Sequence, residues 1–230
     1  MKETMNMKSA GRTFKKIYRN YKIKIIHVWS HELITKALFD RLSRLGITIV
    51  PYYLFEESKS FLNMADIKPI IDKPYETIIL NRSNINLIKG FGNPSPTENE
   101  FLKLWDKDCS CICLTCEGDV LGYGWVDYRK CNYKYLSFEL KNNEAYAFNF
   151  QTARHMRGRN IAPFLRNFLY EHVGNMGRNR IYSITEQLNT PALKFKEKIN
   201  AKPLLHYVYF NLFNKISKNI KIKTMKNHFS

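Results

Sequence analysis

Apolar and polar positions follow two rhythms along this chain, and the rhythm changes at turn residues. A two-residue period predicts a strand, because successive side chains of a strand point to opposite faces. Apolar residues spaced three and four apart predict a helix. The predicted helices cover residues 30–45, 83–91, 97–105, 160–173 and 189–199, and the predicted strands cover residues 47–55, 77–80, 109–116, 120–128, 133–140, 144–151, 180–185 and 207–213.

Local signals support these boundaries. Ser30 suits the start of the first helix, and Gly46 stands where a glycine ends one. Pro191 falls in a first turn, where proline is tolerated. Glu117-Gly118-Asp119 joins two strands as a hairpin turn. The order is strand, two helices, several antiparallel strands, then helix, strand, helix and strand, which predicts an α+β fold.

One turn carries a chemical signal. Between the strand that ends near Phe150 and the helix that begins near Asn160, the chain reads Arg157-Gly158-Arg159-Asn160 and continues into the helix. Backbone N–H groups at a helix start have no helical partner, and the helix dipole favours an anion there. The turn therefore predicts a phosphate site, and an enzyme with an anionic cofactor.

Composition narrows the class of protein. The 230 residues are 44% apolar and 14% aromatic, which fits a packed core and excludes a disordered chain. The net charge of +17 is concentrated at the ends: residues 1–49 hold 11 basic and three acidic residues, and residues 214–230 hold five lysines and no acid. We therefore expect a basic N-terminal arm and a basic C-terminal tail.

Basic ends suit an anionic partner such as an acidic carrier protein, an acidic membrane surface, a cofactor phosphate or nucleic acid, and they also suit simple solubility. Residues 1–74 could pack on the catalytic domain as an extension, or could dock on a membrane or a partner. No helix-turn-helix, zinc-finger or RNA-recognition signature is present, which makes nucleic acid the less favoured partner.

Five cysteines raise the question of a metal. Cys109, Cys111 and Cys113 fall on one face of a predicted strand and Cys116 on the other, so one strand cannot bring four thiols to one ion. Buried reduced thiols and no metal are expected. The chain has no apolar run near 20 residues and no secretory signal, so we expect a cytoplasmic protein.

The element order and the turn resemble the GNAT superfamily of N-acyltransferases. The family signature at this turn is Gln/Arg-x-x-Gly-x-Gly/Ala, and Arg157 and Ala162 match it. Asn160 replaces the middle glycine, and asparagine tolerates left-handed backbone better than most residues. Gly122-Tyr123-Gly124 also resembles the third strand of the family.

The segment from Asn189 to Ala201 resembles a second family motif, Asn-x-x-Ala-x-x-hydrophobic-Tyr-Glu-Lys-hydrophobic-Gly-Phe. Lys196 stands where the family often has a tyrosine that protonates the leaving thiolate. Asn200 and Ala201 replace Gly-Phe.

The resemblance implies a GNAT-like mixed, mostly antiparallel sheet flanked by helices over residues 75–213, after an extension (1–74) and before a tail (214–230). It implies acetyl or another acyl transfer from coenzyme A to a primary amine of a small molecule, such as an amino sugar or amino acid. A long-chain or carrier-protein donor is an alternative, and a nucleic-acid-binding module is the alternative from another class. The implied cofactor-binding residues are Phe150, Gln151, Thr152, Arg157, Gly158, Arg159, Asn160, Ile161, Ala162 and Asn189.

The resemblance also implies a gap between the fourth and fifth strands, where the strand at Phe150–Thr152 would bind the pantetheine arm and a backbone N–H would polarise the thioester. Glu144 and Glu186 are the candidate bases, because carboxylates can accept a proton directly or through water. His155 is expected on the loop surface or at the cofactor rim, in preference to the role of a base. The proton donor is left open among Lys196 with a lowered pKa, Tyr207 and solvent.

Overall fold

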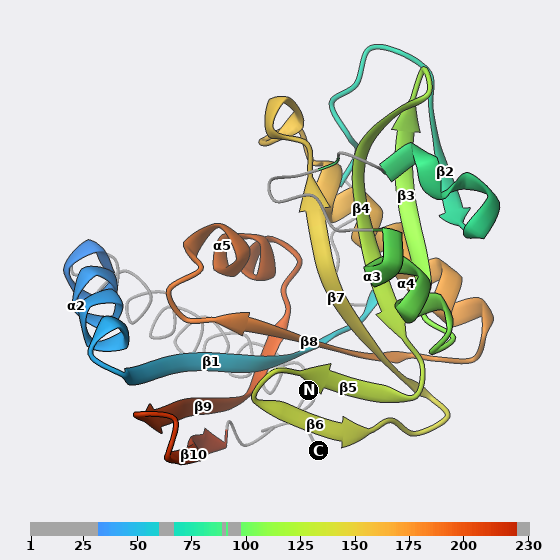
Figure 1. The fold of residues 1–230 in the computed structure, drawn as a ribbon. Coiled ribbons are helices and arrows are strands. Elements are labelled where there is room, and N and C mark those ends of the chain that lie inside the picture. The colour runs from blue at the N-terminus through green and yellow to red at the C-terminus, as the bar shows by residue number, and fades with distance from the viewer. Residues whose placement is uncertain (1–31, 60–66, 89–90, 92–97, 225–230) are drawn as a thin grey trace, which may run out of the picture. The chain divides into compact units, whose positions relative to one another are not determined.

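The computed structural model describes residues 32–59, 67–88, 91 and 98–224. Helices lie beside a sheet whose strands pair mostly antiparallel, as expected of an α+β protein (Figure 1). The helices are α2 (Glu32–Arg44), α3 (Glu98–Trp105), α4 (Ile161–Asn175) and α5 (Thr190–Lys198), with 3₁₀ segments η3 (Arg82–Ile88) and η4 (Arg154–Met156). The strands are β1 (Ile47–Glu57), β2 (Tyr75–Leu80), β3 (Ser110–Cys116), β4 (Asp119–Asp127), β5 (Lys130–Tyr133), β6 (Leu136–Glu139), β7 (Glu144–Thr152), β8 (Arg180–Glu186), β9 (Lys202–Leu212) and β10 (Ile216–Thr224).

Eight strands form one sheet in the order β10-β9-β1-β8-β7-β4-β3-β2. Strands β2, β3, β4 and β7 pair antiparallel in turn, and β8 pairs antiparallel with β1. Strand β7 pairs with β8 in parallel. The predicted mixed, mostly antiparallel sheet flanked by helices is confirmed.

The hairpin between β3 and β4 forms where its turn chemistry predicts it. Glu117 and Gly118 both have positive φ angles, 51° and 85°, and this is the pair of left-handed residues that suits the twist of a two-residue hairpin. The cysteines of β3 are free, and Cys111 and Cys113 are fully buried. Their burial raises the pKa of both thiols, which keeps them neutral.

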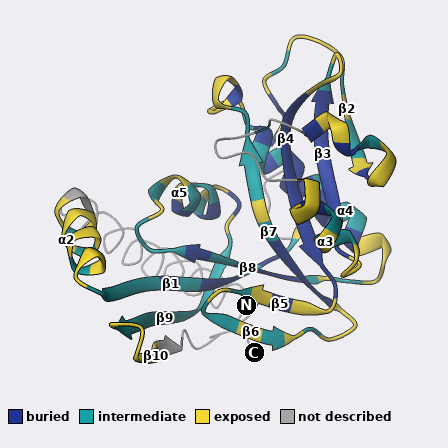
Figure 2. Cartoon of the chain, in the orientation of Figure 1, coloured by how far each residue is buried: buried dark blue, intermediate teal, exposed yellow. Residues whose placement is uncertain are grey.

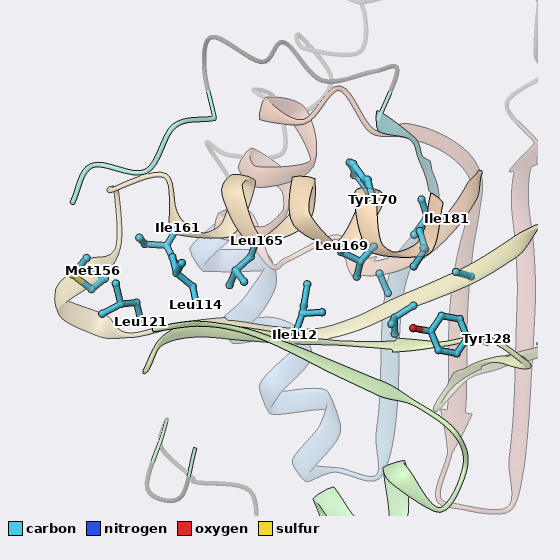
Figure 3. Packing of buried hydrophobic residues seen from close by; sticks show 14 residues of the cluster. Ile112, Leu114, Leu121, Tyr128, Met156, Ile161, Leu165, Leu169, Tyr170 and Ile181 are labelled. Atoms are coloured by element: carbon cyan, nitrogen blue, oxygen red, sulfur yellow. The ribbon is translucent and has the colours of Figure 1, made fainter. Parts of the chain in front are cut away.

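Strands β3 and β4 are buried along most of their length (Figure 2), and hydrophobic clusters pack on both faces of β3. On one face, Leu165 and Leu169 of α4 point toward Ile112 and Leu114 of β3 (Figure 3). On the other face, Trp125 of β4 packs with η3, α3 and the cysteines of β3. The two-residue alternation of β3 therefore supplies both cores at once.

Three elements differ from the sequence prediction. Residues 82–88 form the 3₁₀ segment η3 with a kink at Asn84, where we expected an α-helix over 83–91. Residues 130–139 form a separate two-stranded sheet, β5–β6, where a single strand over residues 133–140 was expected. Strand β10 lies within residues 214–230, which we expected as a tail. Such pairings depend on partners distant in the sequence, which local periodicity does not report.

Strand β1 lies between β8 and β9 in the large sheet, with Phe55 opposite Ser183 and Glu57 opposite Ile181. The domain boundary expected after residue 74 stays a prediction. The chain divides into two compact units: residues 50–209 with 219–230, and residues 1–49 with 210–218.

In the smaller unit, α2 ends at Arg44 and Gly46 has a φ of 82°, as expected of a glycine that ends a helix. The expected Ser30 cap and the basic arm lie outside the described residues. No helix that the structure describes is long and apolar enough to cross a membrane.

Candidate functional site

The turn before α4 places two residues with left-handed backbone directly before the start of a helix. Gly158 and Asn160 both have positive φ angles, 81° and 61°. Asn160 is therefore left-handed, a conformation that asparagine tolerates better than most residues, as expected. The chain enters α4 directly after this residue, and Phe164 N–H donates the first helical bond to Asn160 O at 3.1 Å.

Asn160 also ties the turn to two other segments. Its Nδ2 donates to the backbone oxygen of Lys68 at 3.2 Å, and its Oδ1 accepts from Lys198 Nζ at 2.7 Å. The neighbouring Arg159 O accepts from Ile70 N–H at 3.0 Å. A glycine would supply the backbone conformation but none of the side-chain contacts.

Strands β7 and β8 separate next to this turn. Their parallel pairing runs from Glu144 with Arg180 to Tyr146 with Tyr182 and goes no further. Beyond it, Asn149 has a φ of 53° and the register between β4 and β7 shifts, which marks a bulge. The expected gap between these strands is confirmed. It leaves an edge of β7 with backbone groups available to a ligand.

A pocket of about 1540 Å³ joins the turn to the gap. Its wall includes residues from β7, β8, α4 and α5. Of the predicted cofactor-binding residues, the wall contains Phe150, Gln151, Thr152, Arg157, Gly158, Asn160, Ile161, Ala162 and Asn189. Arg159 is exposed and lies outside this wall.

Asn189 has a structural task as well. It is the N-cap of α5, and its Oδ1 accepts from Ala192 N–H at 3.2 Å. Pro191 in the first turn has no N–H to satisfy, so one asparagine and one proline start the helix.

The two predicted bases lie apart. Glu186 is in the pocket wall, half-buried, where it accepts from Tyr133 Oη at 2.9 Å and pairs with Lys134 at 3.1 Å. Burial and this carboxylate raise the pKa of Tyr133, so its hydroxyl stays a donor.

Glu144 is not among the residues that form the wall of this pocket. It is buried at the start of β7, where Tyr182 Oη donates to it at 2.9 Å and Lys141 N–H at 3.0 Å. Arg180 pairs with it at 3.6 Å. These contacts join β7, β8 and the preceding turn, so the geometry gives its carboxylate a structural task. His155 belongs to η4 and is exposed in the pocket wall, which agrees with the expected surface position.

A buried polar cluster that sequence reasoning missed lies behind the pocket. Glu57 of β1 accepts at one oxygen, Oε1, from Lys196 of α5 and from Ser183 of β8. Its other oxygen accepts from Tyr170 Oη at 2.8 Å and lies 3.2 Å from Arg166 Nε. Lys196 Nζ donates to Ser183 Oγ at 2.6 Å.

The cluster is almost fully desolvated. Glu57, Arg166 and Lys196 are 0%, 2% and 4% exposed. Burial lowers the pKa of Lys196 to about 8. The charge of Glu57 opposes this shift, and the nearby Arg166 cation adds to it. Burial by itself would raise the pKa of the Glu57 carboxyl. The charges of Arg166 and Lys196 have the larger effect and lower this pKa to about 2. Glu57 therefore remains ionised at neutral pH.

Two signals in the sequence could have revealed the cluster. Arg166 is a cation within the apolar helix that follows the phosphate turn, and Lys196 replaces a tyrosine of the family motif. Glu57 gave no signal, because its partners come from segments more than 100 residues away.

Comparisons with known proteins agree on the fold. No model of a known protein family matches the sequence, and no curated protein matches it. Among solved structures, an acetyltransferase from the GNAT family of Colwellia psychrerythraea has a TM-score of 0.53 and 17% identity, covering 72% of this chain and 57% of that chain. A functionally unknown conserved protein from Staphylococcus epidermidis ATCC 12228 has a TM-score of 0.50 and 10% identity, covering 76% of this chain and 66% of that one. This chain spans less than two thirds of the length of either protein. The structural likeness shows that it has a GNAT fold.

Proposed function

We propose that this protein is an N-acyltransferase that moves an acetyl or other acyl group from coenzyme A to a primary amine of a small molecule. The observation that carries the proposal is one pocket whose wall includes both the turn before α4 and the part of β7 that does not pair with β8. A thioester of coenzyme A has phosphates at one end and an amide-bearing arm at the other, and this pocket offers groups for both.

The residues present fit the phosphates. The N–H groups of Gly158, Asn160, Ile161 and Ala162 lie at or just before the start of α4, where the helix dipole adds a positive potential. The N–H of Arg159 already donates to Met156 O at 3.3 Å. Arg157 and Arg159 are exposed beside the turn and supply cations. Gly158 has no side chain to block a ligand, and a β-carbon added there would meet no protein atom within 4 Å.

The residues also fit the arm. Backbone groups of Phe150, Gln151 and Thr152 would bind its amides along the free edge of β7, as one strand binds another. A backbone N–H in the same region would polarise the thioester carbonyl. We assign the role of general base to Glu186, which would take a proton from the amine directly or through water.

The test is the binding of acetyl-CoA to the full-length protein, measured by isothermal titration calorimetry. Gly158→Ala is compared with Gly177→Ala, because both glycines have positive φ angles (81° and 76°) and open space at the β-carbon. Both changes strain the backbone by a similar amount. Only Gly158→Ala places a methyl group at the phosphate turn, so we expect it alone to weaken binding, by about tenfold or more.

Equal weakening in both variants, or no saturable binding to the unchanged protein, would exclude coenzyme A from this pocket. A panel of longer acyl-CoAs and of acyl carrier proteins identifies the donor in the same instrument. Turnover with a panel of amines, followed by release of the coenzyme A thiol, then identifies the acceptor.

A further inference from the structure

We propose that Arg166 and Lys196, held by Glu57, form the site that receives the coenzyme A sulfur as a thiolate when the thioester bond breaks. This inference rests on the proposed function and assigns a catalytic task to a cluster that the phosphate turn and Glu186 leave unexplained.

The first support is charge. The cluster contains two cations and one carboxylate, and the hydroxyl of Tyr170 stays neutral because burial and Glu57 raise its pKa. Among the described residues, those that interact with Lys196 are Glu57, Arg166, Ser183 and two aromatic rings. The buried cluster therefore carries a net positive charge. Burying an unbalanced charge is costly, and an anion at the pocket wall would balance it.

The second support is an unused donor. Arg166 Nη1 is buried and has no hydrogen-bond partner among the described residues. Arg166 Nε lies close enough to Glu57 for an ion pair, but its N–H does not point along a hydrogen bond. The guanidinium lies over the Phe150 ring, 3.8 Å from its centre. An unpaired buried N–H of a cation is rare and costly, so such a donor points to a ligand.

The third support is position. Arg166, Ser183 and Lys196 all belong to the wall of the pocket. Ser183 directly follows Tyr182, the last residue of β8 that pairs with β7. The cluster therefore adjoins the point where the two strands separate, and Phe150 connects it to the free edge of β7.

The chemistry follows from these groups. The amine nitrogen bonds to the carbonyl carbon of the thioester, the carbon–sulfur bond breaks, and its electron pair goes to sulfur. The thiolate lies beside two cations, and Lys196 can transfer its proton to sulfur and regain one from water. Burial lowers the pKa of Lys196 to about 8, so its ammonium gives up a proton more readily than that of an ordinary lysine. The proton that the amine loses goes to Glu186.

The test measures the ionisation of the coenzyme A thiol when it is bound to the full-length protein. Thiolate absorbance in the ultraviolet is followed against pH, with the complex of desulfo-coenzyme A, which lacks the thiol, as the blank. We expect the bound thiol to titrate about one pH unit or more below the free value of roughly 8.5.

Four variants separate the causes. Lys196→Met should raise the thiol pKa toward the free value, but it also leaves the buried Glu57 carboxylate with only one of its two cations. The double variant Glu57→Gln with Lys196→Met removes that carboxylate charge as well, and it should raise the thiol pKa in the same way. Lys196→Arg keeps the cation and should keep the thiol pKa low. Lys103→Met, at an exposed lysine of α3, should leave it unchanged.

A bound thiol that titrates like free coenzyme A, or that keeps its lowered pKa in the double variant, overturns the inference and leaves the proposed function standing. A protein that binds neither coenzyme A nor desulfo-coenzyme A overturns the proposed function itself.

Discussion

At the scale of the residue, the two glutamates Glu186 and Glu144 have different environments. Glu186 is half-buried at the end of β8 and faces the pocket, with one oxygen held by Tyr133 and Lys134. Glu144 is buried, and both of its oxygens are held by neighbouring strands and turns. A base must reach solvent or substrate to exchange a proton, so only the first environment suits the role.

This difference predicts opposite outcomes for two matched substitutions. Glu186→Gln should lower kcat for the best amine of the panel by about 100-fold or more and leave acetyl-CoA binding unchanged, because general-base catalysis typically contributes that much. Glu144→Gln should leave kcat unchanged and lower the free energy of unfolding by about 1–3 kcal/mol, because it removes the pairing with Arg180.

Steady-state kinetics and urea unfolding separate the two effects. A fall in kcat for Glu144→Gln at unchanged stability would instead make Glu144 the base.

At the scale of the element, short local signals set where the helices of the site begin. Asn160 starts α4 through a left-handed backbone, and Asn189 starts α5 through a side-chain cap. The two asparagines thus have different roles: the first shapes the turn before α4, and the second satisfies an N–H of α5.

The cap of α5 can be tested alone. Asn189→Ala removes the acceptor for Ala192 N–H and should lower the free energy of unfolding by about 1 kcal/mol, whereas Asn189→Asp keeps an acceptor and should change it little. Urea unfolding measures both. Equal losses would mean that Asn189 acts through its amide group and not as a cap.

At the scale of the whole molecule, the ends of the chain differ in net charge from the region between them. The ends of the chain carry most of the net charge of +17, while residues 50–213 hold 21 basic and 17 acidic residues. Within this nearly neutral region, Arg154 and Arg157 line the pocket and Arg159 is exposed next to it, so cations gather where phosphates are expected. The basic C-terminal segment also contributes strand β10 to the sheet.

Removal of residues 219–230 should therefore destabilise the fold. Asn219 Nδ2 donates to Tyr52 Oη at 2.6 Å and to the backbone oxygen of Tyr135 at 2.8 Å, and Tyr52 is fully buried. Loss of these bonds should cost about 1–3 kcal/mol and expose an edge of β9 to other chains. Removal of residues 225–230 alone keeps Asn219 and serves as the control.

Urea unfolding and size-exclusion chromatography measure the outcome. Equal stability and equal monomer content in the two truncated variants would show that the end of the chain acts only through its charge.

The sequence by itself determined the elements that depend on near neighbours. Hydrophobic period, turn residues and helix caps report interactions over a few positions, so the hairpin at Glu117-Gly118, the left-handed Asn160 and the start of α5 could be predicted. Only the tertiary structure decided which distant side chains meet. Glu57 lies more than 100 residues before Lys196 and Ser183, and its neighbours follow from the place of β1 beside β8. No local pattern encodes such a pairing, because its free energy comes from burial and charge compensation across the assembled sheet.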